Sequence, residues 1–320
     1  DLFKAFDLVC YDKLWEKLQS LNVPSELIDI LKYWYSSQTN KVKWADSFSE
    51  SYRLECGVRQ GGLTSPALFN VYINQLIDEL GSTGIGFSID GILINNLSYA
   101  DELSPSISAL RRLLKICESY AAAHGLVYNV KKSELLVFKS KGNTVDDIPP
   151  VTLNGVLLKR VTEFKYLGHI VTDDMSDVRD IERERRALAV RCNMLARRFA
   201  RCNRDVKLTL FKAYCQTFYT CSLWVTYTQK AYNDLRVQYN NGFRVLMGLP
   251  RWCSASQMFA EAHTDDFYAI VRKRAASVMS RVRGSSNSIL RTLAAKWENP
   301  FMKHWVYIHM NTKWSRGYMN

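Results

Sequence analysis

The sequence predicts an α+β fold for residues 1–172, followed by an all-helical region over residues 173–320. In the first region, helical patterns alternate with short β-rich runs that are bounded by glycine, proline and asparagine. After Asp174, apolar residues recur at helical spacing. The charge changes at the same place, because residues 1–175 hold 18 Lys/Arg and 21 Asp/Glu, whereas residues 176–320 hold 25 and 10. We therefore expect two modules that meet near residue 172.

The first module is expected to pack amphipathic helices against short strands. Leu14, Leu18 and Leu21 are spaced to share the buried face of one helix. Pro66 is typical of the first position of another helix, and Asn154-Gly155 is typical of a tight hairpin turn. Together, the patterns predict helices over residues 11–36 (interrupted at Pro24), 65–81 and 107–124, and strands within 42–55, 84–99, 126–128, 135–138, 151–158 and 164–171, the last as a single strand.

The second module is expected to consist of helices that each have one apolar face. In the first of them, Ile181, Leu188 and Leu195 share a face, and arginines occupy much of the rest. Residues 248–250 (GLP) would separate two later helices. Further helices are predicted at about residues 205–223, 230–247, 254–263, 266–283 and 286–298.

Two adjacent acids, Asp101 and Glu102, follow an apolar run at residues 92–94 that is expected to form a buried strand. Adjacent carboxylates repel each other, and burying both is costly without a cation. Such a pair therefore indicates a metal site. The alternative is an ordinary acidic turn, which is the commoner meaning of an isolated Asp-Glu pair.

The net charge of +12 lies in the C-terminal part of the chain, since residues 1–175 carry −3 and residues 176–320 carry +15. Such a basic region favours a polyanionic partner, and the alternative is a solvated basic surface. The eight cysteines form no CxxC pair, which favours free thiols in a reducing compartment. With no signal peptide and no long apolar run, we expect an intracellular protein, nuclear or cytoplasmic, that binds no membrane.

Five motifs follow one another along the chain. They are residues 1–7 (DLFKAFD), 57–66 (GVRQGGLTSP), 99–101 (YAD), 125–133 (GLVYNVKKS) and 164–168 (FKYLG). In this order they resemble the polymerase motifs of reverse transcriptases, most closely those of non-LTR (LINE-type) retrotransposons. The resemblance covers nearly the whole chain. It implies a right-hand polymerase palm over residues 1–172, truncated before its fingers, in which helices pack on an antiparallel sheet, and a helical thumb with a C-terminal extension over 173–320.

The resemblance implies an RNA-directed DNA polymerase that uses an RNA template, a DNA primer and deoxynucleoside triphosphates. Asp1 and Asp101 would bind two Mg²⁺ (or Mn²⁺) ions, and Glu102 would assist them as a third catalytic carboxylate. Two such ions hold the attacking and leaving oxygens of nucleotidyl transfer.

The resemblance also implies binding roles. Phe6, Arg59, Gln60, Gly61 and Lys132 would contact the nucleotide or template, Tyr166, Leu167 and Gly168 would hold the primer end, and Arg185, Arg186, Arg197 and Arg198 would contact phosphates. From the residues alone, Phe6 and Tyr166 are also typical of an apolar core, and Lys132 of a solvated surface. Tryptophans 224, 252 and 305 either stack on bases or are buried, and the five dispersed histidines indicate no site.

Two features depart from the family pattern. Glu102 stands where the family has aspartate, and the chain passes from Leu103 directly to Ser104-Pro105, where the family continues with an apolar strand. The sequence therefore leaves three hypotheses: a polymerase, a non-catalytic nucleic-acid-binding remnant of one, or an unfolded or non-functional gene remnant. Primer extension on poly(rA) with magnesium is predicted to give no product above that of an Asp101→Ala control.

Overall fold

A computed structural model describes residues 2–97, 101–102, 104–139 and 148–310, with only the backbone described at residues 97 and 101–102. The described chain combines helices with small two-stranded sheets. It forms two compact units. The first, here the mixed unit, holds the described residues within 2–135 and 148–160, and the second, here the helical unit, holds those within 136–139 and 161–310.

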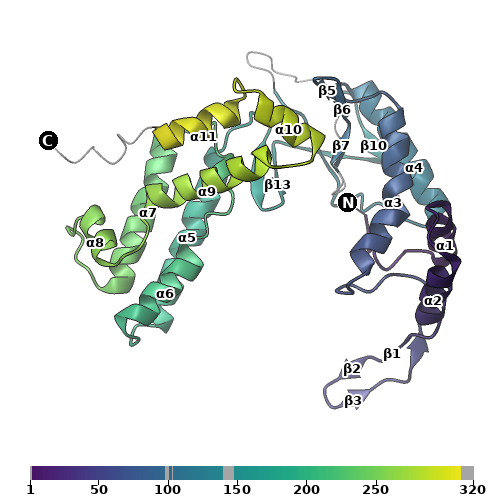
Figure 1. Cartoon of the computed structure of the whole chain (residues 1–320), viewed down its shortest axis with the longest axis horizontal. Coiled ribbons are helices and arrows are strands. Elements are labelled where there is room, and N and C mark those ends of the chain that lie inside the picture. Colours follow the sequence, from purple (N-terminus) through teal and green to yellow (C-terminus); the bar gives the residue numbers. More distant parts are fainter. Residues whose placement is uncertain (1, 98–100, 103, 140–147, 311–320) are drawn as a thin grey trace. The chain divides into compact units, whose positions relative to one another are not determined.

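Four helices build the mixed unit: α1 (Tyr11–Ser20), α2 (Ser25–Ser36), α3 (Ser65–Ser82) and α4 (Ile107–His124). Helix α3 packs against both α1 and α4, as Figure 1 shows. Tyr72 of α3 is fully buried, and its hydroxyl donates a hydrogen bond to the His124 carbonyl at 2.6 Å. Tyr120 of α4 donates in turn to the Tyr72 carbonyl at 2.6 Å, so these bonds fix α3 against α4.

The predicted helix boundaries are confirmed at most ends in this unit. The Ser106 hydroxyl accepts a hydrogen bond from the Ala109 amide at the start of α4, and Gly125 ends the helix in a left-handed conformation. Leu14 and Leu18 are buried as expected. The prediction for Leu21 was wrong, because α1 ends at Ser20 and the Leu21 side chain is 52% exposed.

We expected helices packed on an antiparallel sheet, and the described strands of the mixed unit form two-stranded pairs. Strands β2–β4 lie within residues 43–53, as predicted, whereas β1 at residues 39–40 precedes the predicted range. The run at residues 92–94 is strand β6, which pairs with β5 and is only half-buried, so the prediction of a buried strand was wrong. The pairs are β1 (Thr39–Asn40) with β4 (Tyr52–Arg53), β2 (Lys43–Trp44) with β3 (Ser47–Phe48), β5 (Phe87–Ile89) with β6 (Ile92–Ile94), β7 (Asn96–Leu97) with β8 (Asp101–Glu102), β9 (Glu134–Leu136) with β12 (Lys159–Val161), and β10 (Thr152–Leu153) with β11 (Val156–Leu157).

The helical unit begins with a hairpin of β13 (Glu163–Tyr166) and β14 (His169–Thr172). We expected one continuous strand over residues 164–171, and this prediction was wrong. Leu167 and Gly168 have φ values of 45° and 91°, so they form a two-residue turn between the strands. Two successive residues with positive φ are typical of the type I′ turn, which suits the twist of a hairpin.

Helices form the rest of this unit, and Figure 1 shows α5 and α7 lying side by side. Ile181, Leu188 and Leu195 are buried on the predicted apolar face of α5. The helix predicted at 205–223 ends early, because α6 stops at Cys215 and only a short 3₁₀ turn follows, and α11 was not predicted. The helices are α5 (Val178–Arg198), α6 (Arg204–Cys215), α7 (Gln229–Met247), α8 (Ala255–Glu261), α9 (Phe267–Arg283), α10 (Ser288–Ala295) and α11 (Pro300–Met310), with the 3₁₀ turn η1 at Cys221–Leu223.

Within the described part of the chain, no helix combines the length and the apolar character that a membrane crossing requires.

Candidate functional site

Backbone hydrogen bonds bring three distant segments of the mixed unit together. The Phe3 amide donates to the Val127 carbonyl at 2.7 Å, beside an antiparallel bridge between residues 2 and 128. The Val58 amide donates to the Phe6 carbonyl at 2.7 Å. The segment that follows Asp1 therefore lies between the residues 57–66 motif and the residues 125–133 motif.

Gly57 permits the close approach of two of these segments. Its amide donates to the Val9 carbonyl at 2.8 Å, and its φ is +92°. A Cβ atom at this position would lie 2.9 Å from the carbonyl oxygen of Asp7, which is closer than real Cβ contacts. A side chain here would force the first two motifs apart, so the close approach of these motifs requires glycine at position 57.

The residues predicted to contact nucleotide or template lie near this junction in different environments. The Phe6 ring stacks on Phe69 of α3, with ring centroids 4.8 Å apart, and is only partly exposed. The Arg59 guanidinium donates to the Asn40 side chain at 3.0 Å, which connects the loop to strand β1. Lys132 is exposed and lies in a turn, where its backbone amide donates to the Asn129 carbonyl at 2.9 Å. The remaining two, Gln60 and Gly61, lie in an exposed turn before α3.

The hairpin of β7 and β8 carries the predicted acids. Leu97 pairs with Asp101 and Asn96 pairs with Glu102. The hairpin is anchored by buried Asn95, whose side-chain amide donates to the Leu80 carbonyl of α3 at 2.6 Å. Residues 104–106, which the structure describes, are not part of a strand, and this agrees with the abbreviated sequence after Glu102.

The predicted metal ligands themselves fall outside the description. Asp1 lies outside the described residues, and so do the side chains of Asp101 and Glu102. Among the side chains that are described, no three His, Cys, Asp or Glu residues gather in a group that could hold a metal ion. The chemistry of the predicted donors fits magnesium, because carboxylate oxygens are the ligands that this ion prefers.

In the helical unit, the predicted primer-binding residues occupy the β13–β14 turn. Tyr166 and His169 are paired across the hairpin, and Leu167 and Gly168 form the turn between them. The Leu167 side chain is 59% exposed. The turn therefore presents its backbone and an apolar side chain outward.

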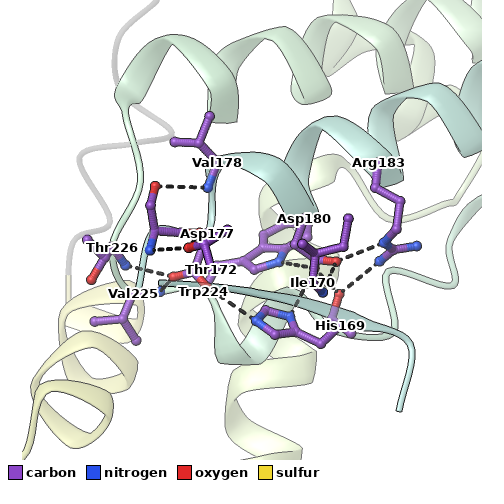
Figure 2. A network of polar contacts seen from close by, with 12 residues as sticks. His169, Ile170, Thr172, Asp177, Val178, Asp180, Arg183, Trp224, Val225 and Thr226 are labelled. Carbon is purple, nitrogen blue, oxygen red and sulfur yellow. Dashed lines mark hydrogen bonds and ion pairs between the residues drawn. The ribbon is translucent and has the colours of Figure 1, made fainter. Parts of the chain in front are cut away.

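Next to this hairpin, the carboxylate of Asp180 is the centre of a buried polar network (Figure 2). Its Oδ2 accepts hydrogen bonds from Thr220 Oγ1 at 2.6 Å and from Trp224 Nε1 at 2.7 Å. Its Oδ1 accepts from Arg183 Nε at 2.8 Å and from the Ile170 amide of β14 at 3.1 Å. One fully buried carboxylate thus joins the hairpin, α5 and the segment before α7.

Figure 2 also shows His169 between two carboxylates. Its Nδ1 lies 3.1 Å from Asp180 Oδ2, and its Nε2 lies 3.4 Å from Asp177 Oδ1. Burial alone would lower the pKa of His169, but hydrogen bonds to both carboxylates raise it to about 9. Burial would raise the pKa of Asp180, but hydrogen bonds from His169, Arg183 and other donors hold it well below its usual range. At neutral pH the pair is therefore imidazolium and carboxylate.

Asp177 extends the same network through both its backbone amide and its carboxylate. Its amide donates to the Thr226 carbonyl at 2.7 Å. Its Oδ2 accepts from the Val225 and Thr226 amides at 2.7 and 2.8 Å. The start of α5 is thereby fastened to the segment that precedes α7.

The predictions from sequence missed this network, since the dispersed histidines indicated no site. The sequence contains only a weak indication of this network. Asp177 and Asp180 are three residues apart at a helix start, and His169 directly follows the Leu167-Gly168 turn. Nothing in the sequence associates them with Trp224, which lies 44 residues beyond Asp180.

The predicted phosphate-binding arginines of α5 fall into two groups. Arg185 and Arg186 both pair with Glu182, at 2.7 and 2.9 Å. Hydrogen bonds from Arg185, assisted by Arg186, lower the pKa of Glu182 to about 2. The other two, Arg197 and Arg198, are exposed in the last turn of the helix. Of the three tryptophans considered for stacking, 224 and 305 are buried and 252 is 86% exposed.

Comparison with known proteins decides the family. The family model described as reverse transcriptase (RNA-dependent DNA polymerase) matches residues 1–171. The chain belongs to the reverse transcriptase family. It is 24% identical over 309 residues to the RNA-directed DNA polymerase from mobile element jockey of Drosophila funebris, covering 92% of this chain and 33% of that protein.

Other relatives of this reverse transcriptase-family chain also come from retrotransposons. It is 30% identical over 179 residues to the Pol polyprotein of the type-1 retrotransposable element R2 of Popillia japonica, covering 53% of this chain and 25% of that protein. It is 23% identical over 308 residues to the jockey polymerase of Drosophila melanogaster. The chain spans about a third or less of the length of these relatives. The resemblance to non-LTR retrotransposon polymerases is therefore confirmed, at modest identity.

Proposed function

We propose that this chain is the polymerase region of an RNA-directed DNA polymerase from a non-LTR retrotransposon. The observation that carries the proposal is the junction of three motifs: the segment after Asp1 is hydrogen-bonded to Val58 on one side and to Val127 on the other. In the proposed assignment, residues 1–172 serve as the palm, and residues 173–320 serve as the thumb with its helical extension.

The proposed reaction uses Asp1 and Asp101 to hold two Mg²⁺ (or Mn²⁺) ions, with Glu102 as an additional carboxylate. When bound, such ions supply charge stabilisation for the attacking and leaving oxygens of nucleotidyl transfer. The protein's own residues orient the substrates. Arg59, held by the Asn40 side chain at 3.0 Å, would contact the template or the incoming nucleotide. Phe6, stacked on Phe69, would favour deoxynucleotides.

The proposed partners are an RNA template, a DNA primer and deoxynucleoside triphosphates. The exposed Arg197 and Arg198 support phosphate contacts, because exposed guanidinium groups bind phosphates without reading sequence. Arg186 can join them by exchanging Glu182 for phosphate, because its side chain is 71% exposed and exposed ion pairs are weak, whereas Arg185 is 35% exposed and is held by two hydrogen bonds to Glu182. The eight cysteines are free thiols, which supports a reducing nuclear or cytoplasmic compartment.

A second candidate is a non-catalytic binder of template–primer duplex. It is favoured by the described residues 104–106, which continue no strand after Glu102, because a shortened strand orients Asp101 less firmly than a full return strand. A misplacement of about 1 Å can cost about 10²-fold in rate.

Primer extension separates these candidates. The substrate is oligo(dT) annealed to poly(rA), with magnesium, and Asp101→Ala is the control. We expect the wild-type chain and the Asp101→Ala control to bind the duplex equally, and the wild-type chain to extend the primer no further than the control does. Extension that disappears in Asp101→Ala would assign the complete reaction to this chain. Absence of template–primer binding at low salt would contradict both candidates.

A further inference from the structure

The β13–β14 hairpin folds with the helices of the helical unit, although its sequence belongs to the polymerase motifs. Two residues attach its second strand to α5. Ile170 donates its amide to Asp180 Oδ1 at 3.1 Å, and His169 approaches Asp180 Oδ2 at 3.1 Å. Arg179 of α5 also binds Glu163 of β13 at 2.8 Å. The hairpin is thus held to the first turns of α5 from both of its strands.

The attachment point lies directly beside the turn. His169 is the first residue of β14 and pairs with Tyr166, so the contacts of His169 hold one end of the Leu167-Gly168 turn. The His169 side chain is 16% exposed and the Asp180 side chain is fully buried, so water competes little with the hydrogen bond between them. Buried charge-assisted hydrogen bonds are stronger and more directional than exposed ones.

We propose that His169 and Asp180 are positioning residues for the 3′-terminal nucleotide of the primer. They hold the Leu167-Gly168 turn at a fixed distance from the arginines of α5. The turn would contact the terminal nucleotide while the arginines contact phosphates farther along the same duplex. This inference rests on the proposed function, because it requires template–primer binding.

The rest of the network keeps Asp180 itself in place. Thr220 and Trp224 donate to the oxygen that faces His169, at 2.6 and 2.7 Å. The Trp305 indole donates to the Ser222 carbonyl at 2.7 Å, which secures the segment between these two donors. Thr220→Val would remove one hydrogen bond from Asp180 at nearly constant side-chain volume. It therefore perturbs the position of Asp180 without changing any residue of the hairpin.

The test measures the primer end and the duplex separately. Template–primer duplexes carry 2-aminopurine either at the primer 3′ terminus or at an internal position, and fluorescence anisotropy reports overall affinity. For His169→Leu we expect the protein-induced change at the terminus to need about tenfold more protein, as for one lost charge-assisted hydrogen bond, while affinity for a blunt duplex changes less than about twofold. His169→Asn, whose amide can replace the Nδ1 donor, should recover most of the terminal signal.

Controls and contrary outcomes follow from the same measurements. His263→Leu, at an exposed histidine of the same unit, should change neither signal. Thr220→Val should shift the terminal signal in the same direction as His169→Leu, which keeps the test valid if the leucine variant does not fold. If His169→Leu weakened binding to the blunt duplex and to the template–primer duplexes equally, or left the signal at the primer terminus unchanged, the positioning role alone would be overturned. Failure of the wild-type chain to bind any duplex would overturn the proposed function and this inference with it.

Discussion

At the residue scale, the charged state of the His169–Asp180 pair depends on hydrogen bonding rather than on exposure. Both groups are buried, and burial alone would favour their neutral forms. His169 contacts two carboxylates, and Asp180 accepts hydrogen bonds from four side chains and one backbone amide. These hydrogen bonds stabilise the ionised pair in the folded state. Both residues are therefore expected to contribute to the free energy of unfolding.

The stability of the helical unit should depend on pH through His169. Its folded pKa of about 9 lies above the ordinary 6.5, so its stabilising effect is complete below about pH 6.5 and is lost as the pH rises through 9. This difference corresponds to about 3 kcal/mol. Urea unfolding of wild type and His169→Gln should therefore differ most at pH 6 and least at pH 10. A constant difference across this range would contradict the assigned charge.

Removal of the Asp180 charge should be severely destabilising. Asp180→Asn removes the fully buried carboxylate that Arg183 and His169 share and leaves each with one more distant carboxylate, so we expect the free energy of unfolding to fall by about 3 kcal/mol. Asp234→Asn is a matched control, since Asp234 pairs with Lys230 in an exposed position, at 2.7 Å. We expect the control to change stability by less than about 0.5 kcal/mol. Similar values for both variants in urea titrations would show that the buried network contributes little.

At the element scale, helix α5 determines how the helical unit is built. It packs along α7, and both the hairpin and the segment before α7 are attached to its first turns. Gly242 lets α7 approach α5 closely, because a Cβ atom there would overlap the Sγ atom of Cys192. Cys192 is itself buried and lies 3.6 Å from the Cys215 sulfur of α6, so it has little room to move.

Gly242→Ala should therefore destabilise the protein by about 2 kcal/mol through overpacking, despite the better helix propensity of alanine. Gly81→Ala is the matched comparison. Gly81 lies in α3 with no atom within 4 Å of the added Cβ, so we expect a stability gain of about 0.5 kcal/mol. Thermal or urea unfolding measures both. The double change Gly242→Ala with Cys192→Ala should recover part of the loss, and an unaffected Gly242→Ala protein would disprove the close packing.

At the scale of the whole molecule, the basic charge and the polymerase motifs lie in different parts of the chain. Residues 176–320 carry the net positive charge, whereas four of the five motifs lie in the mixed unit. If the chain binds nucleic acid as proposed, most of the electrostatic attraction should come from the helical unit.

Duplex binding should therefore show a steep salt dependence that arises from the helical unit. Replacing both Arg197 and Arg198 by glutamine should reduce the slope of log Kd against log salt concentration by about 2, because each phosphate contact contributes about 0.9. Lys13→Gln with Lys32→Gln removes the same charge from α1 and α2 of the mixed unit and should leave the slope nearly unchanged. If the two double variants lose equal slope, the binding charge is not concentrated on α5.

The sequence by itself determined the family, the order of the motifs and most helix positions. Local chemistry explains this success: Ser106 and Gly125 bound α4, and Asn154-Gly155 forms the predicted turn between β10 and β11, because caps and turns depend on neighbouring residues. The single strand expected at residues 164–171 was wrong because the Leu167-Gly168 turn interrupts an otherwise continuous β-rich run.

Only the tertiary structure decided which polar groups are buried together. His169 and Asp180 are 11 residues apart, and Trp224 lies 44 residues beyond Asp180, so no local pattern could reveal their contact. The same holds for the junction of Val58 and Val127 with the segment after Asp1. Helices and turns follow from local propensities, whereas a buried network exists only once distant segments exclude water from the same place.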